Sequence, residues 1–118
     1  MWWMLLRGAW ALGIPALSGL IEIEQPGEVT VGDAPTFTLR VPDAEVVFLA
    51  ECEIEGKTDK QTVTSPVLDV GASMSIALDA QHPVSSAECV LVANFANGLS
   101  ERRSATISWT WVEPQADQ

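Results

Sequence analysis

Two stretches near the end of the chain, both alternating between apolar and polar side chains, limit its fold more than any other feature. One face of the first carries Cys89, Leu91, Ala93 and Phe95, and one face of the second carries Ala105, Ile107, Trp109 and Trp111. A side-chain period of two is typical of a β-strand with one buried face. We therefore predict two antiparallel strands whose apolar faces are covered by a second sheet.

The segment between these stretches has the composition of a turn. Asn97-Gly98 tolerates positive φ, and the polar run of residues 100–104 follows it. We predict that this polar run belongs to the loop between the two strands.

The preceding part of the chain reads as a series of short strands separated by turn signals. The expected strands are residues 21–24 with a brief continuation at 29–31, 36–41, 45–54, 61–64 at an edge, and 73–79. No helical period is present. Residues 19–112 are therefore predicted to form one all-β domain, an antiparallel β-sandwich of about seven strands, followed by a polar tail at 113–118.

The N-terminal segment differs from the rest in charge and hydropathy. Residues 1–21 contain one charged side chain, Arg7, and Ala16-Leu17-Ser18 resembles a small-x-small cleavage site. We predict that residues 1–18 are a cleaved secretory signal. Two alternatives remain open, an uncleaved membrane anchor and a segment packed within an assembly.

The charge of the chain limits its partners. With 16 acidic and 6 basic residues its formal net charge is −10. Such a surface repels nucleic acid and anionic lipid headgroups, so contact with a membrane is expected only through residues 1–20, if they are retained. The acidity either serves solubility or favours a basic partner.

The sequence around the first alternating stretch resembles a known family. The motif Val90-x-Val92-Ala93-Asn94-x-x-Asn97-Gly98-x-Ser100 is similar to the end of fibronectin type III and related immunoglobulin-like domains, where Ala-x-Asn and a Gly-Ser turn lie between the last two strands. The resemblance covers about a dozen positions in motif and residues 20–112 in strand pattern. It implies an immunoglobulin-like sandwich and brings no catalytic residues with it.

The two cysteines, Cys52 and Cys89, are either one disulfide or two buried thiols. The chain has no Cys-x-x-Cys and one histidine, so it lacks the ligands for a zinc site. Both cysteines share a face with apolar residues, and the type III order places the third and sixth strands side by side. The resemblance thus predicts a bond between adjacent strands, which export to an oxidising compartment would favour.

No set of residues points to catalysis. The single histidine, His82, precedes a proline in a turn, and no Gly-x-Ser-x-Gly is present. Glu51, Glu53 and Glu55 alternate along one outward face, where carboxylates ~7 Å apart do not converge on one ion. We expect neither an enzyme nor a cofactor or metal site.

The outward side chains of two strands suggest a docking surface. If Phe48 and Leu91 point inward, four aliphatic side chains point outward on neighbouring strands: Val47, Leu49, Val90 and Val92. Their expected rim is Glu45, Glu51 and Glu88. A clustered apolar patch with a charged rim is typical of an interface, although a loop or the N-terminal segment could also cover it. Arg102 and Arg103, the only basic pair, are the other candidate contacts.

These features together favour a non-enzymatic, secreted, immunoglobulin-like module. We expect it in the periplasm or outside the cell, where it mediates protein binding or assembly in a bacterial envelope. The alternative is a membrane-tethered accessory subunit of a larger membrane complex, with the N-terminal segment retained and the domain facing outside the cytoplasm.

Overall fold

A computed structural model describes residues 21–114 of the 118-residue chain. The signal or anchor predicted for residues 1–18 lies outside the described residues. So do residues 115–118, which make up most of the predicted polar tail.

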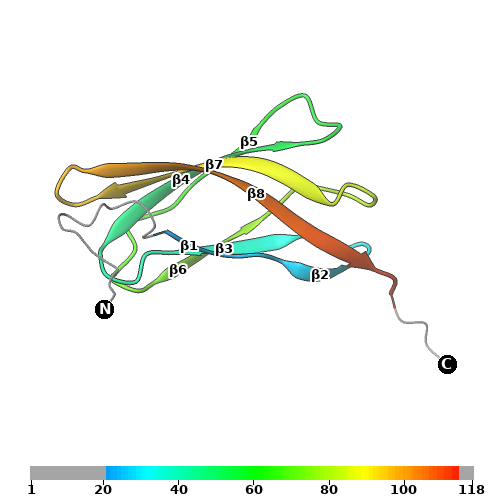
Figure 1. Cartoon of the computed structure of the whole chain (residues 1–118), viewed down its shortest axis with the longest axis horizontal. Coiled ribbons are helices and arrows are strands. Elements are labelled where there is room, and N and C mark those ends of the chain that lie inside the picture. Colours follow the sequence, from blue (N-terminus) through cyan, green and yellow to red (C-terminus); the bar gives the residue numbers. More distant parts are fainter. Residues whose placement is uncertain (1–20, 115–118) are drawn as a thin grey trace, which may run out of the picture.

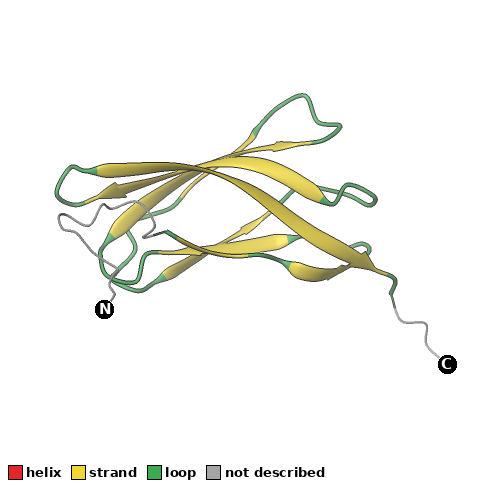
Figure 2. Cartoon of the chain, in the orientation of Figure 1, coloured by secondary structure: helices red, strands yellow, loops and turns green. Residues whose placement is uncertain are grey.

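The described residues form two β-sheets that face each other, with no helix among them (Figures 1 and 2). The strands are β1 (Glu22–Glu24), β2 (Gly27–Thr30), β3 (Thr36–Arg40), β4 (Val46–Ile54), β5 (Gln61–Thr64), β6 (Ser73–Ala77), β7 (Ser86–Phe95) and β8 (Ser100–Val112). One sheet has the order β1-β3-β6 and the other β2-β8-β7-β4-β5. The prediction of an all-β sandwich is confirmed.

The strand count and the pairing near the N-terminus differ from the prediction. The stretch expected as a continuation of the first strand is a separate strand, β2, so there are eight strands rather than about seven. β2 runs parallel to β8, whereas β1 is antiparallel to β3 in the other sheet. The chain changes sheet after Pro26, where Gly27 has a φ of 74°, a conformation that glycine adopts without steric cost.

The loop predicted at residues 100–104 is also wrong, because these residues are the first part of β8. Pairing with β7 begins at Ser100, opposite Asn94, and continues without a break. Only residues 96–99 form the turn, which is closed by a hydrogen bond from Phe95 N to Leu99 O of 2.9 Å. Backbone pairing does not depend on apolar side chains, so a polar run can extend a long strand.

The core lies between the sheets and follows the alternation of the sequence. Phe37 and Leu39 of β3 face Phe48 of β4, Leu91 of β7 and Ile107 of β8, and none of the five is measurably exposed. Fully burying side chains of this size contributes about 1.5–3 kcal/mol each relative to leaving them in water.

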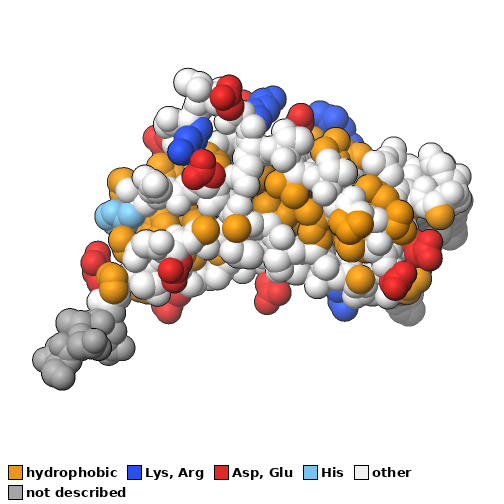
Figure 3. All heavy atoms as spheres, turned by 180° about the vertical axis from the view of Figure 1, so that it is seen from behind, with side chains coloured by type: hydrophobic (Ala, Val, Ile, Leu, Met, Phe, Trp, Pro, Cys, Tyr) orange, Lys and Arg blue, Asp and Glu red, His pale blue; other side chains and the backbone are white. Residues whose placement is uncertain are grey.

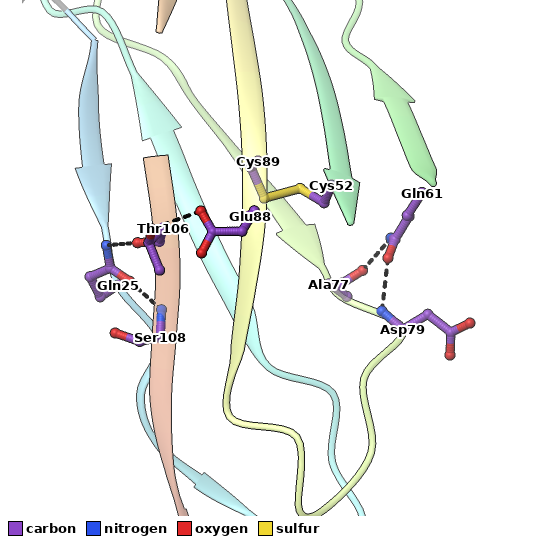
Figure 4. Close-up of a disulfide and its surroundings, with 9 residues drawn as sticks. All are labelled: Gln25, Cys52, Gln61, Ala77, Asp79, Glu88, Cys89, Thr106 and Ser108. Atoms are coloured by element: carbon purple, nitrogen blue, oxygen red, sulfur yellow. Dashed lines mark hydrogen bonds between the residues drawn. A yellow bond between two sulfur atoms is a disulfide. The ribbon is translucent and has the colours of Figure 1, made fainter. Parts of the chain in front are cut away.

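Two glutamine side chains occupy strand edges where a backbone partner is missing (Figure 4). Gln25 accepts from Ser108 N at 3.0 Å and donates to Thr106 O at 3.4 Å, on β8. Gln61, on the edge strand β5, accepts from Asp79 N and donates to Ala77 O, both at 2.8 Å. A primary amide can satisfy one donor and one acceptor, as a neighbouring strand would.

Candidate interaction surface

A disulfide joins β7, the central strand of the five-stranded sheet, to its neighbour β4. Cys52 of β4 lies directly opposite Cys89 of β7, their Cα atoms are 4.0 Å apart, and both side chains are buried (Figure 4). The predicted bond between adjacent strands is confirmed. A buried disulfide is compatible with an oxidising location outside the cytoplasm.

The four aliphatic residues of the predicted patch lie on the opposite face of these same two strands. Leu49 and Val92 are direct cross-strand neighbours, while Val47 lies opposite Asn94 and Val90 opposite Glu51. All four side chains are partly exposed, whereas their chain neighbours Phe48 and Leu91 are buried. The register therefore brings Val47, Leu49, Val90 and Val92 together; we call them the outer patch.

Polar side chains border the outer patch on both sides. The row through Leu49 and Val92 ends in Thr64 on β5 and in Arg102 on β8. Further along the sheet Glu53 lies opposite Glu88, which accepts a hydrogen bond of 2.9 Å from the Thr106 hydroxyl. Two of the three predicted rim residues, Glu51 and Glu88, are thus next to the patch, and Glu45 immediately precedes β4.

The outer face of the three-stranded sheet has a different character. Its outward side chains are polar except Ala77: Glu22, Glu24, Thr36, Thr38, Arg40, Ser73 and Ser75. The Arg40 guanidinium is 2.7 Å from the Glu22 carboxylate, and the Thr38 and Ser75 hydroxyls are 3.3 Å apart. This face is suited to contact with solvent, because its polar side chains are exposed or partly exposed and several of them bond one another.

The structure separates the two arginines that the sequence presents as a pair. Arg102 and Arg103 are successive residues of β8, so their side chains leave opposite faces of the sheet. Arg102 is exposed beside Val92 of the outer patch. Arg103 has the inward parity of Ile107, and its Nη1 donates a 2.8 Å hydrogen bond to Ile21 O next to β1.

His82 lies in an exposed turn, as predicted, at one end of the sandwich. Its ring packs edge-on against Trp111 with 5.8 Å between the centroids, and the His82-Pro83 peptide bond is cis. The two rings border an open surface hollow of about 670 Å³, together with Asp33 and Asp79. The sequence carries no signal for this hollow, since nothing in the spacing of these residues brings them together.

Other exposed apolar side chains lie in loops. Val67 and Val70, in the segment between β5 and β6, are 66% and 60% exposed, and Leu99 in the last turn is 53% exposed. Figure 3 shows hydrophobic side chains along the middle of the side opposite to that of Figure 1, with acidic and basic side chains around them. The apolar residues 66–68, followed by Asp69 and Val70, were the available signal for the first two.

Within residues 21–114 no group of three or more histidine, cysteine or acidic side chains is arranged to hold a metal ion. Glu51 and Glu53 follow the outward face of β4, and Glu55 lies in the turn after it. The described part of the chain also contains no helix that is long and apolar enough to span a membrane.

Comparison with known proteins adds no relative. No protein-family model, no curated protein and no solved structure matches this chain.

Proposed function

We propose that this protein is a non-enzymatic, exported, immunoglobulin-like module that binds another protein of a bacterial envelope through its outer patch. The contrast between the two outer faces carries the proposal: one is polar and internally bonded, and the other places Leu49 beside Val92 with valines on either side. An apolar cluster with a charged rim is what a docking surface requires.

The finer assignment of the fold rests on the strand order. An order of β1-β3-β6 facing β8-β7-β4-β5, with Asn97-Gly98 in the last turn, supports a fibronectin type III-like domain. In that family the function resides in surfaces rather than in a catalytic centre, which fits a binding module.

The proposed location, periplasmic or extracellular, rests on the buried Cys52–Cys89 bond and on the signal-like residues 1–18. The intact mass of the native protein tests it. We expect a mass that corresponds to loss of residues 1–18. Retention of Met1 would instead favour the alternative, a membrane-tethered accessory subunit of a larger complex.

A photo-crosslinking amino acid tests the surface. Placed at Val92, in the cells that make the protein, it should form an adduct with one defined protein, whereas the same amino acid at Ser75 should not. Ser75 is the matched control because it also points outward, from the three-stranded sheet.

The adduct should disappear when Leu49→Glu is added and persist when Thr38→Glu is added. A carboxylate at position 49 would have to be desolvated without a partner in the complex. Equal adducts from both faces would refute a specific outer-patch interface.

A further inference from the structure

β8 is much longer than the strand that covers its outer edge. β2 pairs with the stretch from Trp109 to Val112, and the Gln25 side chain satisfies the edge at Thr106 and Ser108. Within residues 21–114, no strand pairs with the same edge of β8 between residues 100 and 104.

The bonds made by Trp109 and Ser108 show which backbone groups of β8 face β7 and which face this outer edge. Trp109 N donates to Ser85 O, before β7, whereas Ser108 N donates to Gln25 on the opposite side. Successive residues of a strand turn their N–H and C=O groups to opposite edges. The even-numbered residues Ser100, Arg102 and Ser104 therefore turn theirs away from β7, and all three residues are exposed.

Such a row of N–H and C=O groups is a template for another strand. The remaining question is which strand fits. The local charge favours an acidic strand, because Arg102 is an exposed cation in the middle of this stretch, on a chain whose formal charge is −10. Among the described residues the ion pairs are Arg40–Glu22 and Lys57–Asp79, and neither involves Arg102.

A second copy of this chain fits this edge poorly. Antiparallel pairing of two such edges about their midpoint would place Arg102 opposite Arg102, and like charges directly opposite each other destabilise a sheet. An acidic side chain at that position would instead form a cross-strand ion pair.

The edge is continuous with the outer patch. Arg102 lies directly opposite Val92 of β7, which in turn lies opposite Leu49 of β4. A strand added to β8 would extend the same face, with its outward side chains beside Arg102.

We propose that the edge of β8 from Ser100 to Ser104 receives an extended segment of the partner protein, with an acidic side chain opposite Arg102. This inference rests on the proposed binding function and specifies the chemistry of the partner.

The test uses the full chain, labelled with ¹⁵N, and a short synthetic peptide in which threonine alternates with valine and the central residue is glutamate. In the free protein we expect fast amide hydrogen exchange at Arg102 and Ser104, and slow exchange at Arg103, whose amide faces β7. The peptide should slow exchange at Arg102 and Ser104. A counterpart peptide with a central lysine should have a weaker effect.

Charge exchange makes the test specific. Arg102→Glu should weaken binding of the glutamate peptide by about tenfold or more and strengthen binding of the lysine peptide, whereas Arg102→Lys should retain the wild-type preference. Because residue 102 is exposed, these variants should fold, as an unchanged amide spectrum of β4 and β7 would verify.

Several results would overturn the proposal. They are unchanged exchange at Arg102 and Ser104 with saturating peptide, the same affinity for both peptides, or protection of the edge in the free protein. Protection that grows with protein concentration would indicate a second copy, and protection independent of concentration would indicate that the chain covers its own edge.

Failure of this proposal is distinguishable from failure of the proposed function. A defined adduct from Val92 with no peptide binding at β8 would leave the outer patch as the interface and remove the edge. Peptide binding at β8 with no adduct from Val92 would leave the edge as a binding site and remove the outer patch as the interface.

Discussion

The outer faces of the two sheets are built from the same alternating pattern, and yet one is polar and the other is largely aliphatic at its centre. On the three-stranded sheet the outward positions are filled by groups such as Arg40 and Glu22, which pair with each other. On the five-stranded sheet the central outward positions are filled by aliphatic side chains such as Leu49 and Val92. Both faces sit above the same core, so core packing alone does not account for the difference, and the proposed binding function is our explanation for it.

The two faces of the five-stranded sheet also differ in burial. Val90 and Leu91 are adjacent in β7, and one is partly exposed while the other is fully buried. Substitutions at such matched positions are expected to have very different effects on stability.

The largest effect on stability is expected on the inward face of the five-stranded sheet, at Leu91. Leu91→Glu should abolish folding, because a carboxylate there would be buried without a partner. Circular dichroism and urea denaturation would measure the loss. A variant with a normal cooperative transition would show that this position is not core.

Removal of the disulfide should have the next largest effect on stability. Replacing Cys52 and Cys89 together by alanine should lower the free energy of unfolding by about 4 kcal/mol, since the bond closes a long loop in the unfolded chain. Urea denaturation of the double variant against the oxidised protein gives the value.

A thiol titration of the native protein under denaturing, non-reducing conditions is the control for that experiment. It should find no free thiol. Two reactive thiols per chain would contradict the bond.

A smaller loss of stability is expected on substitution of Ser65, one of the few buried polar residues. Its hydroxyl accepts from Phe48 N at 2.8 Å and donates to Pro66 O at 2.7 Å. Ser65→Ala should lower the free energy of unfolding by about 1–3 kcal/mol, because it leaves a buried amide of β4 without its side-chain acceptor.

The matched control for Ser65 is Ser75→Ala, on the polar outer face. Its hydroxyl is exposed, so the change should stay within about 0.5 kcal/mol. Equal losses at the two serines would mean that burial does not separate them.

The smallest effect on stability is expected on the outer patch. Val90→Glu or Leu49→Glu should change the free energy of unfolding by less than about 1 kcal/mol, because an outward side chain contributes little to the core. The same variants should abolish partner binding, measured as the adduct from Val92. Equal loss of thermal stability at Val90 and Leu91 would show that both faces are buried in the monomer, and the outer patch would then be core.

Much of the fold could be predicted because alternation is a local property. The parity of Phe48, Cys52, Cys89 and Leu91 fixes which side of each strand faces the core, and all four are buried as expected. The same parity predicted that the four residues of the outer patch point outward. Whether they bind a partner is a prediction that the crosslinking experiment addresses.

The errors arose where pairing rather than composition decides the structure. The polar residues at 100–104 have the composition of a loop, but the ladder with β7 makes them strand. Val29 appeared to continue the first strand, but its pairing with Trp111 places it in the other sheet.

The sequence by itself determined the sandwich, its inward and outward faces, and two cysteines with the same parity, because each follows from side chains one or two positions apart. Only the tertiary structure decided that Arg102 and Arg103 separate, that Gln25 and Gln61 act in place of missing strands, and that within residues 21–114 no strand pairs with the outer edge of β8 at residues 100–104. The physical reason is that hydrogen-bond partners of a strand come from distant parts of the chain, and no local pattern records which edge they leave uncovered.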